Sequence, residues 1–418
     1  MQAVGQSATR NRLRQSTSMT TTITPPSAGP VPRSLFGKVV SPEWELLLTT
    51  ASAGDQTPRL RSLVSHPLDW ALFERLAETH GLLPIAAARL GADPSLLPGP
   101  VVEELDTICQ ENARRSLWFA GELFSVLDTL ASANVEAVPF KGPTLAVMAQ
   151  GDLILRQFCD LDIMVHQRDW PRAKQALLNA GFSEKHHLTP REEKAYVASA
   201  CDFTFHHGPV RNVLEIHWDF VPRFFAIRIP LRQLLARATT VDLCGRRVPT
   251  LAPEDLLLCL AVHGAKHAWS RLCWLSDIAH LIHRADLDQD KVRRRAERWH
   301  IARIVKIALY LCQWTLGADL PVSLQTWIQE DRDASKVAEV LVRNLFSDKK
   351  IRTESRTYFR LFASQREHPA DRARMWALLA TTSSLTEWRT IRLPAPLFRL
   401  YGAVRFWRLS QRLLRGKL

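Results

Sequence analysis

The stretch FCDLDIMV (residues 158–165) places two aspartates one residue apart in an otherwise apolar run. Because side chains of a strand alternate between its two faces, Asp160 and Asp162 point the same way, and the apolar residues between and after them point the other way. Two carboxylates this close repel each other, and burying either one costs free energy. A divalent cation such as Mg²⁺, which prefers oxygen ligands, would compensate both charges. The stretch therefore predicts a buried strand that carries a metal site.

The composition indicates a folded protein without a broad nucleic-acid-binding face. The chain has 418 residues and a formal net charge of +13. Residues 1–42 contain five Lys or Arg and residues 388–418 contain eight, with no acid in either segment, so the ends account for the whole excess. The neutral body disfavours a DNA-binding or RNA-binding surface.

The cysteines and the hydropathy pattern bear on the compartment. The seven cysteines are odd in number, widely spread and never paired as CxxC, which is typical of buried thiols in a reducing compartment. No run reaches the roughly 18 apolar residues of a membrane span, and the N-terminus lacks the apolar core of a secretory signal. We expect a cytoplasmic protein.

The pattern along the chain predicts an α+β fold, in which a small mixed β-sheet is flanked by helical regions on both sides. The core contains the runs VEAVPF (135–140), FCDLDIMV, and the alternating pair CDFTFHH (201–207) and VLEIHWDF (213–220), which predicts a hairpin. The expected divisions are a disordered lead at 1–34, an N-terminal helical region at 35–134, the α/β core at 135–230, a helical region at 231–345, and a C-terminal helical region with a basic tail at 346–418.

A third carboxylate lies in the run VLEIHWDF. Glu215 is on the face opposite its apolar neighbours Leu214 and Ile216. If this strand lies beside the aspartate strand, three carboxylates converge, which suits two-metal phosphoryl chemistry. Alternatively, Glu215 faces solvent on a half-exposed hairpin, and the spacing alone does not separate the two interpretations.

The tripeptide Lys141-Gly142-Pro143 joins the run VEAVPF to the expected start of a helix. Backbone N–H groups at a helix start carry partial positive charge and suit phosphate. Gly142 permits a close approach of the backbone, and Lys141 adds a charge. A Lys-Gly pair is also common in ordinary turns, so its position just before the paired aspartates is what makes it a candidate phosphate site.

Three segments together resemble a known family. They are PFKGPTLAVMAQGDLILRQFCDLDIMV (139–165), NVLEIHW (212–218) and HGAKHAWSRLCWLSDIAHLI (263–282). They are similar to the bacterial family described as uncharacterised nucleotidyltransferases, within the polymerase-beta-like nucleotidyltransferase superfamily. The similarity covers most of the chain after the lead.

The resemblance implies Mg²⁺-dependent transfer of a nucleoside monophosphate from an NTP to an acceptor, with release of pyrophosphate. Asp160, Asp162 and Glu215 would be the catalytic carboxylates and the Mg²⁺ ligands, and the turn Lys141-Gly142 would hold the triphosphate. The superfamily turn usually continues with Gly or Ser. Pro143 stands here instead and removes one N–H donor.

Other polar residues are candidates to contact the nucleotide. Arg156 is a candidate for the phosphate contact that Pro143 removes, and it would otherwise neutralise the aspartates or pair with Asp152. His263 and Lys266 share one stripe of a helix that belongs to the resemblance, and packing between helices is their alternative role. The sequence HGAKH lacks the glutamate of HExxH, which argues against zinc. His217 shares a strand face with Glu215 and either lines the site or is a structural, hydrogen-bonded histidine.

The C-terminal tail, PLFRLYGAVRFWRLSQRLLRGKL (396–418), alternates arginines with aromatic and aliphatic residues. A basic amphipathic helix of this kind predicts a weak contact with an anionic membrane or an acidic partner. The alternative is that its apolar stripe packs on the body.

Two further functional hypotheses accompany the transferase. One is a catalytically inactive nucleotide-binding or scaffold protein of the same fold, which the Pro143 departure favours. The other is a toxin-like enzyme that modifies RNA or protein with the same groups. An NTP and an acceptor are the expected partners, and the acceptor is not identified by the sequence.

Overall fold

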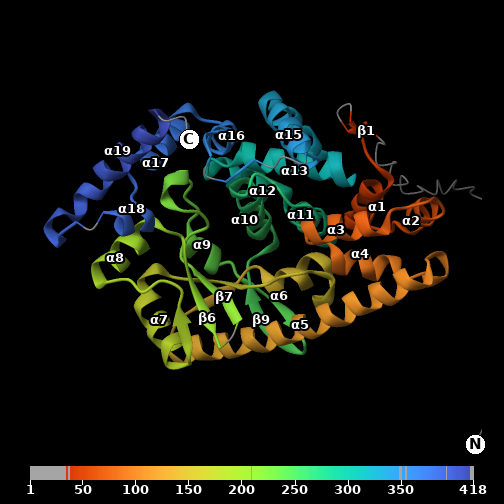
Figure 1. Ribbon diagram of the computed structural model, residues 1–418, viewed down its shortest axis with the longest axis horizontal. Coiled ribbons are helices and arrows are strands. Elements are labelled where there is room, and N and C mark those ends of the chain that lie inside the picture. The colour runs from red at the N-terminus through yellow and green to blue at the C-terminus, as the bar shows by residue number, and fades with distance from the viewer. Residues whose placement is uncertain are drawn as a thin grey trace, which may run out of the picture.

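Helices surround a single five-stranded sheet in the computed structural model of the protein (Figure 1). The structure describes residues 34–35, 38–208, 210–347, 351–353, 355–391 and 393–414. Apart from Ser34, the lead predicted at 1–34 lies outside these residues. The α+β fold class is confirmed. None of the helices in the described part of the chain is long and apolar enough to cross a membrane.

The sheet is mixed, with the strand order β3-β4-β7-β6-β5. Its strands are β3 (Ala137–Pro139), β4 (Leu161–Val165), β7 (Val210–His217), β6 (Asp202–His207) and β5 (Phe182–Glu184). β4 and β7 run parallel, and the other neighbours pair antiparallel. The predicted hairpin is present as β6–β7. A separate short pair, β1 (Ser34–Leu35) and β2 (Lys38–Val39), precedes the helices.

One face of the sheet is covered by α5 (Gly99–Ser132) and α7 (Trp170–Asn179), as Figure 1 shows. Most apolar residues of FCDLDIMV and VLEIHWDF pack in this core against the second half of α5, whereas Met164 and Phe220 belong to the core on the other face. On this helix Ser116 lies on the buried face and is 1% exposed, whereas the next residue, Leu117, is 56% exposed.

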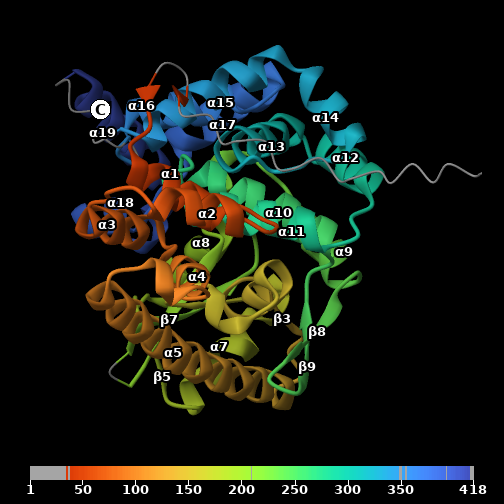
Figure 2. The ribbon, with the colours of Figure 1, turned by 90° about the vertical axis from the view of Figure 1, so that its right-hand side faces the viewer.

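The other face of the sheet meets a helical layer, in which N-terminal and later helices form one core. Ser52 Oγ donates a hydrogen bond to the carbonyl of Leu316 (2.8 Å), and Ser276 Oγ donates one to the carbonyl of Ala51 (2.8 Å). Helix α11 contacts both α1 and α10 in this layer (Figure 2). The layer consists of α1 (Pro42–Ala51), α2 (Thr57–Val64), α3 (Trp70–His80), α4 (Leu83–Leu90), α10 (Pro253–Lys266), α11 (Leu272–Arg284), α12 (Gln289–Arg298), α13 (Ala302–Leu316), α14 (Val322–Gln329) and α15 (Arg332–Leu345).

The remaining helices join or close these layers. A short helix after β3, α6 (Gly142–Leu145), continues into a π-helical turn over Ala146–Gln150. The others are α8 (Pro190–Ser199), α9 (Leu231–Leu235), α16 (Arg356–Ser364), α17 (Pro369–Thr381), α18 (Leu385–Thr390) and α19 (Tyr401–Leu414).

A two-stranded hairpin interrupts the helical region predicted from 231. It consists of β8 (Thr239–Leu243) and β9 (Arg246–Thr250). Its turn residues Cys244 and Gly245 both have positive φ, 53° and 80°. Such a pair forms the two-residue turn that matches the twist of hairpin strands.

Candidate active site

Strands β4 and β7 bring the predicted carboxylates to one place. Asp162 and Glu215 are direct partners in the parallel register. Asp160 precedes β4 by one residue and is partly buried. Because the intervening apolar side chains pack into the core on the α5 side, the carboxylates point to the opposite face, toward α10.

A cavity of about 240 Å³ lies at this face. The residues that line it come from the turn after β3, from the loop before β4, from β6, from β7 and the segment after it, and from the C-terminal end of α10. They are Phe140, Lys141, Asp160, Asp202, Glu215, His217, Phe220, His263, Lys266 and His267. Asp162 is only 2% exposed and contacts two of these residues. Of the other predicted site residues, Gly142 lies beside the cavity and Arg156 lies outside its lining.

Asp162 is held by two cationic partners. Its Oδ1 accepts hydrogen bonds from Lys141 Nζ at 2.6 Å and from His217 Nε2 at 3.0 Å. Burial opposes the charge of Asp162, but Lys141 and His217 outweigh it and hold the pKa of this carboxyl below its usual range. His217 is buried too, yet its contacts with Asp162 and Glu215 raise its pKa to about 9. In the protein alone, these residues form a compensated charge cluster.

Among the described residues, Asp160 has no such direct partner. Burial and then the neighbouring charge of Asp162 raise its pKa to about 7. A carboxyl that is this hard to ionise near two others marks a place where negative charge is in excess. The site is therefore short of positive charge beside Asp160.

The turn at Gly142 depends on glycine. Its φ is +57°, which is the left-handed region, and a Cβ here would lie 3.2 Å from the carbonyl oxygen of Asp160. Thr144 Oγ1 donates a hydrogen bond to the carbonyl of Lys141 (3.1 Å) and closes the turn. The turn thus packs directly against the residue that carries the first carboxylate.

Arg156 contacts a different acid from those that the sequence suggests. Its Nε lies 2.9 Å from Oδ1 and 3.1 Å from Oδ2 of Asp277, on α11. Burial opposes its charge, but Asp277 outweighs burial and raises the pKa of Arg156. The structure places Arg156 between the loop before β4 and the helical layer.

Helix α10 contributes two histidines and a lysine. The rings of His263 and His267 lie 4.7 Å apart, and both pack against Trp274. Burial, followed by nearby lysine charges, lowers the pKa of His263 and lowers that of His267 to about 3, so both rings are neutral. Burial opposes the charge of Lys266 as well, but acidic groups that include Asp202 raise its pKa.

Sequence reasoning missed Asp202 and left His217 undecided. Asp202 is the register partner of His217 across β6 and β7. Burial opposes its charge, but His217 and Lys266 lower its pKa. The alternation of DFTF, with Asp202 and Thr204 on one face and two phenylalanines on the other, is the signal that could have identified Asp202.

The residues fit a divalent cation. Asp162, Glu215 and His217 each offer one ligand atom, and these atoms lie within 4.8 Å of one another. The remaining ring nitrogen of His217, Nδ1, is buried without a hydrogen-bond partner among the described residues. Carboxylate oxygens suit Mg²⁺, whereas imidazole suits transition metals, so the ligand set admits both kinds of ion.

The charge balance leads to the same conclusion. His217 would lose its proton on binding the cation and the histidines of α10 are neutral, so four carboxylates at the cavity and its wall would then exceed two ammonium groups by two negative charges. The carboxylates are Asp160, Asp162, Asp202 and Glu215, and the ammonium groups are Lys141 and Lys266. One divalent ion would balance this difference.

A mixed sheet that gathers carboxylates and a Lys-Gly turn around one cavity defines a nucleotidyltransferase-like fold. A family model described as uncharacterised nucleotidyltransferase matches residues 66–317, more than half of the chain. The chain therefore belongs to this family, which confirms the family predicted from the sequence.

A solved structure is also similar to this chain. The chain is similar to the crystal structure of an antigenic nucleotidyltransferase-like protein from Paracoccidioides brasiliensis. The match has 18% identity and a TM-score of 0.34, and it covers 49% of this chain and 94% of the other. No curated protein gives a significant match.

Proposed function

We propose that the protein is a Mg²⁺-dependent enzyme that transfers a nucleoside monophosphate group from an NTP to an acceptor hydroxyl. The observation that carries this proposal is the parallel register of Asp162 and Glu215, beside Lys141, at one cavity. Phosphoryl transfer depends on positioning and electrostatics, so carboxylates and cations are the groups it requires.

The reaction would proceed as an in-line displacement. The acceptor oxygen forms a bond to the α-phosphorus, and the bond from the α-phosphorus to the oxygen that bridges to the β-phosphate breaks. Pyrophosphate leaves with that electron pair, and the hydroxyl proton passes to one of the three carboxylates and then to water. When bound, a divalent cation supplies charge neutralisation at the α-phosphate.

The protein's own residues have separate roles in this proposal. Asp160, Asp162 and Glu215 would hold the cation, with the nitrogen of His217 adjacent to two of them. Lys141 and Lys266 are the ammonium groups at the cavity and would bind the triphosphate, together with the backbone of Gly142. Neutral His263 would donate a hydrogen bond to the nucleotide, and Arg156 would support the site through Asp277.

A second candidate is an inactive nucleotide-binding protein of the same fold. The contacts of Lys141 and His217 with Asp162 favour it, because they already compensate a charge that a metal would otherwise compensate. A toxin-like enzyme that modifies RNA or protein differs from the leading proposal only in its acceptor.

The experiment is incubation with each NTP labelled at the α-phosphate, Mg²⁺ and a cell extract. We expect label on an acceptor together with released pyrophosphate, and a loss of about 100-fold or more in Glu215→Gln, which removes a charge at nearly constant volume. Glu136→Gln, at an exposed acid away from the cavity, is the matched control. Nucleotide binding without label transfer in the wild type would favour the inactive protein, and label on RNA or protein would favour the toxin-like enzyme.

A further inference from the structure

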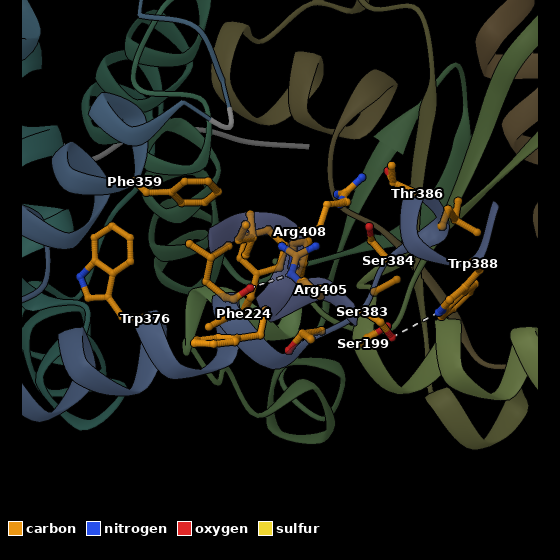
Figure 3. A pocket seen from close by; sticks show the side chains of 18 of the residues that line it. Ser199, Phe224, Phe359, Trp376, Ser383, Ser384, Thr386, Trp388, Arg405 and Arg408 are labelled. Carbon is orange, nitrogen blue, oxygen red and sulfur yellow. Dashed lines mark hydrogen bonds between the residues drawn. The ribbon is translucent and has the colours of Figure 1, made fainter. Parts of the chain in front are cut away.

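A second, larger cavity lies between the catalytic core and the last helices of the chain. Its volume is about 650 Å³, within the range of sites that enclose small organic ligands. Figure 3 shows side chains from α8, α16, α17, α18 and α19 around it. We call it the C-terminal cavity and define it by Ser199, Phe224, Arg360, Trp376 and Phe406, one from each side.

The C-terminal cavity shares its walls with the catalytic cavity. Ala200 lines the larger cavity, and Asp202, two residues on, lines the catalytic one. In the same way, Phe220 lines the catalytic cavity and Pro222 lines the larger one. The two cavities are therefore neighbours, separated by the thickness of these short segments.

A hydrogen bond between α16 and α10 also connects the linings of the two cavities. The hydroxyl of Tyr358 donates to the carbonyl of Lys266, whose side chain lines the catalytic cavity. The next residue, Phe359, lines the C-terminal cavity. A molecule held in the larger cavity would thus lie next to the groups proposed to bind the nucleotide.

The apolar part of the lining is only partly covered by protein. Trp376 is 40% exposed and Phe406 is 59% exposed, although both are large apolar side chains. Phe224 and Phe359 pack edge to face with centroids 6.1 Å apart, and Phe359 also contacts Trp376. Exposed aromatic surface around a cavity of this size is typical of a site for an apolar or aromatic ligand.

The charged part of the lining is entirely basic. Four arginines line the cavity, and no Asp or Glu does so among the described residues. Arg405 and Arg408 both contact the buried carboxylate of Glu387, behind the lining. Their charges are therefore partly compensated within the protein.

Arg356 and Arg360 differ from that pair. Neither forms an ion pair within the described part of the chain, and they lie one turn apart on α16. Arg356 is in the first turn of the helix, where a cation is unfavourable because of the helix dipole. A cation placed against this local preference, and facing a cavity, is suited to an anionic ligand.

We propose that the C-terminal cavity binds the acceptor of the reaction, and that this acceptor is a small organic anion with an aromatic or aliphatic body. The role of this ligand as the acceptor rests on the proposed function. The proposal that the cavity binds an organic anion of this kind does not depend on the proposed function. The triphosphate of the nucleotide must lie at the carboxylates and Lys141, so the nucleotide is assigned to the catalytic cavity and the acceptor to its neighbour.

The test uses anilinonaphthalene sulfonate, a fluorescent aromatic anion of the proposed class, titrated into the full-length protein. We expect one saturable site, with affinity reduced about tenfold in Trp376→Ala and in Arg360→Glu. Both side chains are exposed enough to be replaced without loss of the fold, which a thermal melt would verify. Arg293→Glu, at an exposed arginine of α12, is the matched control and should bind the dye as the wild type does.

Two further arms separate this proposal from the proposed function. ATP with Mg²⁺ should not displace the dye, and Glu215→Gln should bind it normally. In the transfer assay the dye should inhibit the wild type more strongly than Trp376→Ala. Absence of a saturable site, wild-type affinity in both cavity variants, or displacement by ATP would overturn the proposal. If the transfer assay gave no product, the role of the ligand as acceptor would be ruled out, but the binding site shown by the dye would still stand.

Discussion

Lys141 Nζ lies 2.6 Å from Asp162 Oδ1, and this ion pair joins the turn after β3 to strand β4. His217 contacts the same carboxylate oxygen at 3.0 Å. The groups that we propose to bind the triphosphate and the metal therefore also hold the site together in the protein alone. Their contributions to stability and to ligand binding can be separated by substitution.

Replacing Lys141 with methionine should destabilise the protein. The change leaves Asp162 buried with one cationic partner instead of two, which should lower the free energy of unfolding by about 3 kcal/mol. Urea denaturation would measure the loss. The double variant Lys141→Met/Asp162→Asn should lose less than the two single variants added together, because it removes both charges of the pair. Strict additivity would show that the two residues are not coupled.

The ion pair of Arg156 and Asp277 should stabilise the folded protein. Both side chains are buried, and the guanidinium contacts both carboxylate oxygens. Arg156→Met leaves the acid unpaired and should lower the free energy of unfolding by about 3–5 kcal/mol. Arg156→Lys keeps the charge but loses the planar geometry and should lie between this variant and the wild type. A weaker NTP affinity in Arg156→Lys, at unchanged stability, would instead make this arginine a direct phosphate ligand.

The sheet and the gathering of carboxylates were predictable because they follow from a local rule. A period of two places Asp160 and Asp162 on one face and Glu215 on the corresponding face of its own strand. Only the adjacency of the strands had to be assumed, and the structure shows β4 and β7 side by side.

The contacts of the site were not predictable, since they join residues that are distant in the sequence. Arg156 and Asp277 are 121 positions apart, and Asp162 and His217 are 55 apart. No periodicity relates such pairs. The hairpin β8–β9 was missed for a different reason: its Cys244-Gly245 turn departs from the usual Asn-Gly signal, and its strands are short.

Stability should fall between pH 6.5 and about 4 because of His280. Its Nδ1 donates to the carbonyl of Ser276 at 2.8 Å, and its Nε2 lies 3.2 Å from Nη2 of Arg89 and accepts from it. Burial lowers the pKa of His280 to about 4 in the folded protein, against 6.5 ordinarily. The unfolded chain therefore binds the proton first as pH falls.

This difference in proton binding sets the sign and size of the effect. Above pH 6.5 the imidazole is neutral in the folded and unfolded states, and its contribution to stability is fully present. The contribution of neutral His280 to the free energy of unfolding decreases between pH 6.5 and 4 and is lost below pH 4, a total of about 3 kcal/mol. Urea denaturation at several pH values should give a shallower fall in His280→Gln than in the wild type. Parallel curves for the two proteins would contradict the assignment.

Helix α19 should bind anionic membranes weakly. Tyr401 and Arg405 are buried against the body, whereas Trp407 is 55% exposed and does not belong to the lining of the C-terminal cavity. The protein should sediment with vesicles that contain anionic phospholipid, and Trp407→Ala should weaken the partition about tenfold. Trp376→Ala, a tryptophan of the cavity, is the matched control. Equal sedimentation with neutral vesicles would rule out the electrostatic part of the contact.

Alanine substitutions at two glycines with positive φ should distinguish a role of the turn at Gly142 in phosphate binding from the conformational cost of replacing any such glycine. Gly142 and Gly245 have φ of +57° and +80°, and a Cβ at Gly245 would meet nothing within 4 Å, whereas one at Gly142 would lie 3.2 Å from the carbonyl oxygen of Asp160. Alanine at either position should lower the free energy of unfolding by about 1–2 kcal/mol, because both must adopt a left-handed conformation.

Only Gly142→Ala should also affect the site. The added methyl group pushes on the backbone of Asp160, and a displacement of a carboxylate by a few tenths of an ångström weakens a preorganised cation site. Isothermal titration with Mg²⁺ or Mn²⁺, and the NTP assay, should show a clear loss in Gly142→Ala and wild-type values in Gly245→Ala. If both variants lose the same stability and neither loses cation or NTP binding, the turn at Gly142 is a structural feature that takes no part in binding.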